Sequence, residues 1–139
     1  MKRIHINIRV HDLPASIAFY TALFGTGPTT QREDYAKWML DDPRVNFALT
    51  RRAGTPGIEH LGIQAEDEAE LQQLYAGLAE ADAVLREEGH TVCCYARSEK
   101  SWVKDPQGVE WEVFRTYGEH ATFYADDPAT ACCDDACCP

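Results

Sequence analysis

The first half of this chain has a counterpart in its second half. Moving residues 4–24 along the sequence by 55 positions superposes residues of the same kind at several places. The matching pairs are His5 with His60, Asp12 with Asp67, Phe19 with Leu74, and Tyr20 with Tyr75. Agreement at this many positions indicates an internal duplication, so we expect the chain to fold as two similar modules.

The first module has the pattern of a strand, a helix and three further strands. Residues 4–10 alternate between apolar and polar side chains, which predicts a half-buried strand with His5 on its polar face. Asp12 suits a helix N-cap, and apolar residues then recur at helical spacing until Gly25, so we predict a helix over residues 13–24. The further expected strands are 29–34, 36–40 and 45–50, followed by a linker at 51–57.

The second module repeats this order with one ambiguity. Residues 58–65 alternate again, and Asp67 and Glu70 form a capping box that begins a helix. Apolar spacing alone would continue this helix to Gly89, but the repeat requires a strand earlier, so we predict a helix end near Glu80. The remaining expected elements are a strand at 83–88, a long connection at 91–100, a strand at 101–104 and a strand from Val109. The predicted fold is α+β, with two βαβββ modules forming a cupped mixed sheet around a shared cavity.

One carboxylate in the last strand calls for an explanation. Residues 105–108 read DPQG, which predicts a turn, and after it Trp111 and Val113 alternate with Glu112. A glutamate in an arbitrary strand is usually a solvated residue on the outer face of a sheet. The interpretation of Glu112 therefore depends on which other residues lie in phase with it.

Aligning the last strands of the two modules brings Ala48 onto Glu112. The equivalent inward positions are then His5 and Ala48 in one module, and His60 and Glu112 in the other. Two imidazoles and one carboxylate, with further positions left open, are typical of non-haem Fe(II) sites. A single inward histidine is more often a hydrogen-bonded core residue, so the prediction of a metal site rests on all three residues together.

Composition and charge exclude several classes of partner. The chain has 139 residues, 45% of them hydrophobic, and a formal net charge of −10. That charge argues against nucleic acid or anionic lipid as a partner. No apolar run approaches the roughly 18 residues of a membrane span. The alternating start, MKRIHINIRV, lacks the pattern of a signal peptide, so we expect a cytoplasmic protein.

The six cysteines all occur as adjacent pairs: Cys93 with Cys94, Cys132 with Cys133, and Cys137 with Cys138. In a cytoplasmic protein we expect reduced thiols, and neighbouring cysteines rarely meet normal disulfide geometry. Adjacent thiols therefore suggest binding of a soft ligand. For Cys93 and Cys94 the alternative is a pair of small buried apolar residues in a strand.

Residues 1–117 resemble the vicinal oxygen chelate superfamily, which includes glyoxalases, extradiol dioxygenases and fosfomycin-resistance enzymes. The resemblance rests on the paired modules, on His5 and His60, and on the segment DPQGVEWEV. The longer segment HTVCCYARSEKSWVKDPQGVEWEVF resembles the arsenic–carbon lyase and cadmium-induced protein family within that superfamily.

The resemblance implies an activity and roles for the site residues. Cys93 and Cys94 would hold a trivalent organoarsenical substrate, while Fe(II) at His5, His60 and Glu112 activates O2 to cleave the carbon–arsenic bond. Because two residues in a regular strand point to opposite faces, we expect the cysteine pair in a loop within 89–100, closing over the metal about Gly89. The candidates for proton transfer are Tyr95, His90, Lys104, Tyr117 and His120, and those for lining the cavity or orienting the imidazoles are Asn7, Arg9 and Gln64.

Two alternatives remain open at this stage. Another enzyme of the superfamily, such as a glyoxalase or a thiol transferase, would also use two histidines and a glutamate. A soft-metal binding protein without turnover would use the cysteines alone.

The predicted organisation is one domain at 1–117, with modules 1–53 and 57–117, and an acidic tail at 118–139 that is a soft-metal trap or a dispensable appendage. Either a monomer or a homodimer with exchanged modules could complete the cavity.

Overall fold

Both modules pair their strands into one curved sheet. The computed structural model describes residues 1–93, 96–119 and 124–125. The first module contains β1 (Arg3–Val10), α1 (Leu13–Phe24), β2 (Thr30–Gln31), β3 (Tyr35–Asp41) and β4 (Arg44–Arg51). The second contains β5 (Gly57–Ala65), α2 (Glu68–Glu80), β6 (Arg86–Cys93), β7 (Ala96–Lys104) and β8 (Glu110–Glu119), and a short β9 (Tyr124–Ala125) follows. The predicted duplication of a βαβββ unit is confirmed.

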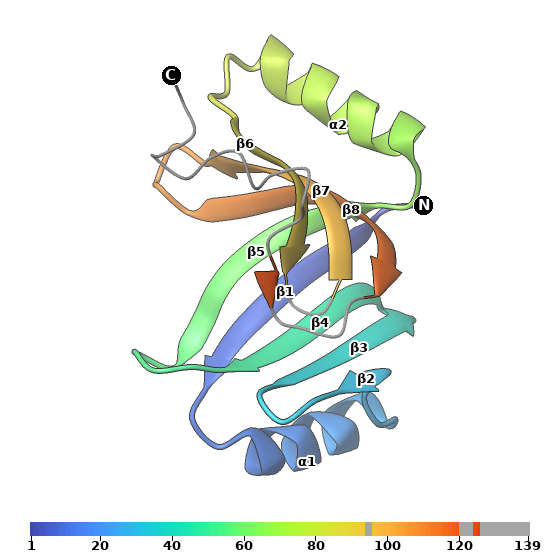
Figure 1. Ribbon diagram of the computed structural model, residues 1–139, viewed down its shortest axis with the longest axis vertical. Helices are drawn as coiled ribbons and strands as arrows, with labels where there is room; N and C mark the ends of the chain where they lie inside the picture. The colour runs from blue at the N-terminus through green and yellow to red at the C-terminus, as the bar shows by residue number, and fades with distance from the viewer. Residues whose placement is uncertain (94–95, 120–123, 126–139) are drawn as a thin grey trace.

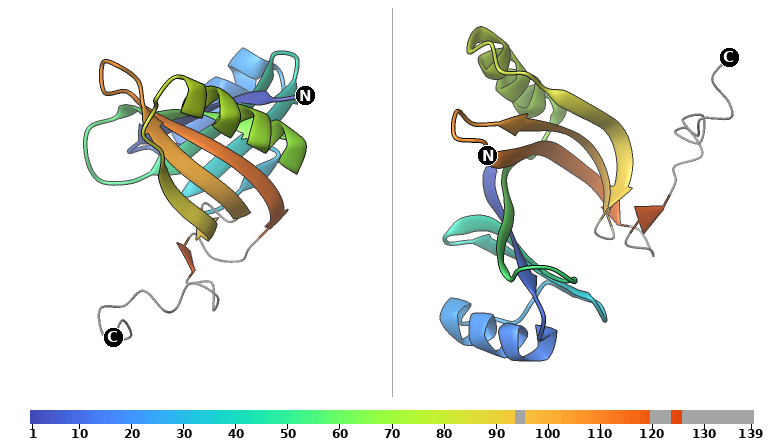
Figure 2. Two further views of the ribbon diagram at one scale, coloured as in Figure 1. Left: turned by 90° about the horizontal axis from the view of Figure 1, so that it is seen from above. Right: turned by 90° about the vertical axis from the view of Figure 1, so that its left-hand side faces the viewer.

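The two modules meet edge to edge along their first strands. The strand order is β2-β3-β4-β1-β5-β8-β7-β6-β9, so the antiparallel pair of β1 and β5 lies at the centre (Figure 1). Within each module the first strand pairs in parallel with the last, β1 with β4 and β5 with β8. The side view in Figure 2 shows a sheet that curves into a cup, with both helices on its outer side. The predicted cupped mixed sheet is confirmed.

Both helices begin after their predicted N-caps, α1 ends at Gly25, and α2 ends at Glu80 as the repeat predicted. The side chain of Asp12 accepts a hydrogen bond from the backbone N–H of Ala15, and Gly25 ends α1 in the left-handed conformation. In α2 the Asp67 carboxylate accepts from the N–H of Glu70, and the Glu70 carboxylate accepts from the N–H of Glu66. Neither helix in the described ranges is long and apolar enough to cross a membrane.

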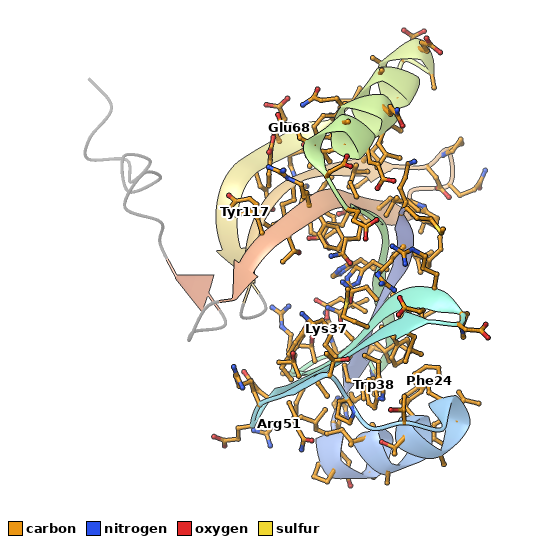
Figure 3. The ribbon with its side chains drawn as sticks, turned by 90° about the vertical axis from the view of Figure 1, so that its right-hand side faces the viewer. Phe24, Lys37, Trp38, Arg51, Glu68 and Tyr117 are labelled. Carbon is orange, nitrogen blue, oxygen red and sulfur yellow. The ribbon has the colours of Figure 1, made fainter. Side chains whose placement is uncertain are left out.

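Each helix covers its own core on the outer face of the sheet. Under α1, Phe24 packs on Trp38 of β3 (Figure 3). It also packs on Phe47 of β4, and both of these sheet residues are buried. Under α2 the core is aliphatic, with Leu71 and Val113 among its buried members. The inner face of the sheet is left for polar residues, several of them buried.

The predicted course of residues 83–104 is wrong. The strand expected at 83–88 lies at Arg86–Cys93, and the strand expected at 101–104 begins at Ala96. The long connection predicted at 91–100 is therefore a β-hairpin, in which Cys93 pairs with Ala96. The sequence hid this hairpin because β7 is polar on both faces, with Ser98 and Lys100 on the inner face and Glu99 and Ser101 on the outer face. A strand with polar residues on both faces shows no apolar alternation.

Candidate metal centre

Three potential metal ligands converge where the two modules join. In the sheet register His5 of β1 lies opposite Gly62 of β5, which in turn lies beside Glu112 of β8. His60 lies two residues before Gly62 on the same strand and therefore faces the same side. The inner face of the cup thus carries all three candidates, and a single chain supplies them.

The register also shows which residue of the first module occupies the position equivalent to Glu112. Gly62 beside Glu112 in the second module corresponds to Asn7 beside Ala48 in the first. The predicted alignment of Ala48 with Glu112 is therefore reproduced by strand pairing. Ala48 has no ligand atom, so the duplicated sheet offers two imidazoles and one carboxylate instead of four ligands.

The ligand atoms form a small triangle. His5 Nε2 lies 3.1 Å from His60 Nε2 and 3.5 Å from the Oε2 atom of Glu112. His60 Nε2 lies 3.3 Å from the same carboxylate oxygen. Atoms spaced in this way subtend angles of roughly 95–115° at an ion held by bonds of about 2.1 Å. Three ligands on one side of an ion leave its other coordination positions open. The donor set therefore fits a divalent metal ion.

Neighbouring groups prepare His5 and Glu112 for metal binding. The Nδ1–H of His5 donates to the backbone carbonyl of Asn46 at 3.0 Å, which leaves Nε2 with a free lone pair. Burial lowers the pKa of His5, against the opposing effect of the Glu112 charge, and so favours the neutral ring that binds metals. Burial alone raises the pKa of Glu112, but its hydrogen bond with His60 and the charges around it, that of Lys100 included, lower it to about 2.

Gly62 is required by the close approach of β5 and β8. A Cβ atom at this position would lie 2.6 Å from the backbone oxygen of Glu112 and 3.3 Å from the Cβ of His5. No side chain fits there without moving one of the two ligands. The sequence alone assigned no role to Gly62, because the neighbours of a glycine are known only from the strand pairing.

Two aromatic rings pack against the imidazoles. The ring of Phe114 meets His5 edge-on at 5.2 Å between centroids, and the ring of Trp102 meets His60 in the same way at 5.0 Å. These contacts restrict the rotation of both imidazoles. They also make the surroundings of the triad partly apolar, which strengthens electrostatic interactions at the site.

Comparison with known proteins identifies the family. A family model described as the Glyoxalase/Bleomycin resistance protein/Dioxygenase superfamily matches residues 2–113. The chain belongs to this superfamily. It is 39% identical over 140 residues to the trivalent organoarsenical cleaving enzyme of Thermomonospora curvata, covering 99% of this chain and 89% of that protein. It is 34% identical over 143 residues to the cadmium-induced protein CadI of Mycobacterium bovis, covering 96% and 94%.

Solved structures share the fold of this glyoxalase and dioxygenase superfamily at lower identity. The 2,3-dioxygenase LapB of Pseudomonas sp. KL28 superposes with a TM-score of 0.62 at 21% identity. The superposition covers 92% of this chain and 47% of that one, so this chain corresponds to about half of the dioxygenase. The predicted vicinal oxygen chelate fold is confirmed.

Lys100 lies beside the triad and was not predicted from the sequence. Its side chain is 5% exposed, and its Nζ lies 3.5 Å from Oε1 of Glu112 and 3.4 Å from Oε2 of Glu88. Lys100 therefore neutralises the carboxylate oxygen that faces away from the imidazoles, and it connects β8 to β6. The segment was predicted to be a loop, and a lysine in a loop gives no signal of an inward position.

Replacing Lys100 with methionine is expected to destabilise the metal-free protein and to strengthen its metal binding. The change leaves the buried Glu112 carboxylate without this cation, and breaking a buried ion pair in this way costs about 3–5 kcal/mol. A divalent metal ion would restore the charge balance. Thermal denaturation with and without metal measures both effects: the melting temperature without metal should fall, and the increase on adding metal should exceed that of wild type. A smaller increase would instead show that Lys100 mainly orients the carboxylate.

The residues predicted to line the cavity or to transfer protons fall into three groups. Asn7 accepts a hydrogen bond from Thr50, and Gln64 accepts one from Asn46, the residue whose carbonyl holds His5. Both therefore support the inner face, as predicted. Lys104 and Tyr117 are largely exposed and contact Glu110 and Arg115, respectively. Arg9 pairs with Glu59 at 3.5 Å.

The predicted loop that carries the cysteine pair is the end of the β6–β7 hairpin. Cys93 is the last residue of β6, and His90, expected in a loop, belongs to the same strand. Gly89 pairs with Lys100 beside a register irregularity in β6, so the predicted hinge is part of the sheet. The remaining residues lie outside the described ranges: Cys94, Tyr95, His120, Cys132, Cys133, Cys137 and Cys138.

Proposed function

We propose that this chain is an Fe(II)- and O2-dependent enzyme that cleaves the carbon–arsenic bond of trivalent organoarsenicals and releases arsenite. The convergence of His5, His60 and Glu112 is the observation that carries the proposal. When bound there, Fe(II) would supply electrons and open coordination positions for O2 chemistry. The proposal agrees with relatives named trivalent organoarsenical cleaving enzymes at 35–41% identity.

Hard and soft ligand atoms of the protein would bind different partners, the metal ion and the substrate. The nitrogen and oxygen atoms of the triad suit iron, while the thiolates of Cys93 and Cys94 suit trivalent arsenic. Ala96, which pairs with Cys93, also pairs with Glu119 of β8, seven residues beyond Glu112. That separation is about 23 Å along a strand. The strands of this hairpin curve toward the open side of the cup (Figure 2), which favours an approach of its end to the metal.

Replacing Cys93 and Cys94 together with serine is expected to abolish binding of a trivalent methylarsenical without affecting Fe(II) affinity. Serine keeps the size of cysteine but removes the soft sulfur donors. Calorimetric titrations with each ligand under anaerobic conditions measure the two affinities separately. Serine at the four cysteines of the tail, 132, 133, 137 and 138, provides the matched control and should leave turnover unchanged. Full activity of the double variant would favour a glyoxalase or thiol transferase instead.

The activity itself is tested by staged addition of its components. The metal-free protein is loaded with Fe(II) without oxygen and mixed with a trivalent methyl or aromatic arsenical, and air is then admitted while arsenic species are followed. Arsenite is expected only when iron, substrate and oxygen are all present. Release of arsenite by metal-free protein, or no release from the complete mixture, would contradict the proposal.

Soft-metal binding without turnover is the second candidate function. The three cysteine pairs and the similarity to a cadmium-induced protein favour it. It predicts stoichiometric binding of arsenite or Cd(II) through the cysteines and no arsenite from organoarsenicals under aerobic reducing conditions. We also propose one domain with modules 1–53 and 57–117, followed by a cysteine-rich tail. The predicted start of that tail at residue 118 lies within the sheet, because β8 runs to Glu119 and Tyr124–Ala125 pairs with β6. Deleting residues 126–139 should lower soft-metal stoichiometry and leave turnover intact.

A further inference from the structure

A pocket separate from the metal centre lies on the outer side of the sheet, between α2 and the strands β7 and β8. Its volume is about 770 Å³, within the roughly 300–1,000 Å³ usual for small-molecule sites. Leu78 of α2, Val103 of β7, and Trp111 and Val113 of β8 are among the apolar residues that line it. Trp111 and Val113 alternate with Glu112 along β8, so the pocket and the triad use opposite faces of that strand.

The first module shows what fills the equivalent space. The cross-strand pair of Trp38 and Phe47 in β3 and β4 corresponds to the pair of Val103 and Trp111 in β7 and β8. Phe24 of α1 packs on both aromatic rings of the first pair. Moved by the 55 residues of the repeat, Phe24 corresponds to Ala79, which is exposed.

The second module therefore lacks two aromatic rings that its duplicate uses to fill the space under the helix. Valine and alanine stand where the duplicate has an indole and a phenyl ring. A cavity left by a missing ring and lined by apolar side chains is suited to bind a small aromatic molecule. The shape of the missing side chains thus indicates the class of ligand.

We propose that the pocket between α2 and the β7–β8 hairpin binds a compact aromatic molecule. The two missing rings define the shape of that molecule. Val103, Trp111 and Val113, which line the pocket, lie on the face of the sheet opposite to the metal centre. The proposal stands whether or not the chain cleaves organoarsenicals.

Titration of the full-length, metal-free protein with naphthalene tests the proposal. Saturable one-to-one binding is expected. Methyl signals of Leu78, Val103 and Val113 should shift in NMR spectra of the wild-type protein. Shifts confined to the α1 side of the sheet, or no saturable binding up to the solubility limit, would overturn the proposal.

Substitutions test whether naphthalene occupies the space of the missing rings. Val103→Trp restores the residue that the first module has at this position and should weaken naphthalene binding at least about tenfold by filling the pocket. Ile58→Trp, on an exposed part of β5, is the control and should not change the affinity.

The substitution test does not depend on one variant. If Val103→Trp loses its far-ultraviolet circular dichroism, Leu78→Trp blocks the same pocket from the helix side. Fe(II) affinity of the blocked variants should stay within about twofold of wild type, since neither residue contacts the triad. Equal probe affinity in the folded blocked variant and the wild type would refute the assignment.

Discussion

Replacing Glu112 with alanine is expected to lower Fe(II) affinity by more than about 100-fold and to abolish O2-dependent arsenite release. Glu112 is the only anionic member of the triad, and its Oε2 lies within 3.5 Å of both imidazole nitrogens. Substituting groups that merely support metal ligands costs about 10–100-fold in affinity, so loss of a ligand should cost more. Anaerobic calorimetry measures the affinity, and arsenic speciation measures the activity.

Two further variants make the Glu112 result specific. Glu110→Ala removes a carboxylate two residues away that pairs with Arg86 and Lys104 at the surface, and exposed ion pairs contribute little. This control should leave iron affinity unchanged. Glu112→Gln keeps the shape of the side chain but removes its charge, and it should lose most of the affinity. Iron binding by Glu112→Ala at the wild-type level would eliminate the proposed centre.

Replacing Gly62 with alanine is expected to lower both stability and metal affinity, although the residue carries no ligand atom. The added methyl group would lie 2.6 Å from the backbone oxygen of Glu112, so β5 and β8 must separate. Overpacking of this kind costs about 1–3 kcal/mol of unfolding free energy. Movement of Glu112 relative to His60 should weaken Fe(II) binding about tenfold or more. Urea denaturation and anaerobic titration measure the two effects.

Gly77 provides the matched control for this substitution. It lies in α2, and a Cβ atom placed there meets nothing within 4 Å. Gly77→Ala should therefore stabilise the protein by about 0.5–1 kcal/mol, because alanine favours the helix, and should not change metal affinity. Wild-type iron affinity in Gly62→Ala would show that the strands tolerate the methyl group and that the close approach is not needed for metal binding.

Local patterns in the sequence determined the architecture and the triad. Asp12, Gly25 and Asp67 mark helix ends through their own hydrogen bonds or backbone conformation, so they could be interpreted without knowledge of the fold. The 55-residue offset related His5 to His60, and the alternation after the DPQG turn placed Glu112 on the inner face. These signals depend on neighbours in the chain or on the repeat.

Strand pairing alone decided the rest of the site. Lys100 reaches Glu112 because β7 pairs with β8, and Gly62 must lack a side chain because β5 approaches β8 closely. The β6–β7 hairpin escaped prediction because β7 carries polar residues on both faces, Lys100 on the inner face and Ser101 on the outer face, and so shows no apolar alternation. Contacts between residues distant in sequence leave no periodic pattern. The three candidate ligands could be proposed from the sequence through the repeat, whereas the lysine and glycine beside them required the folded sheet.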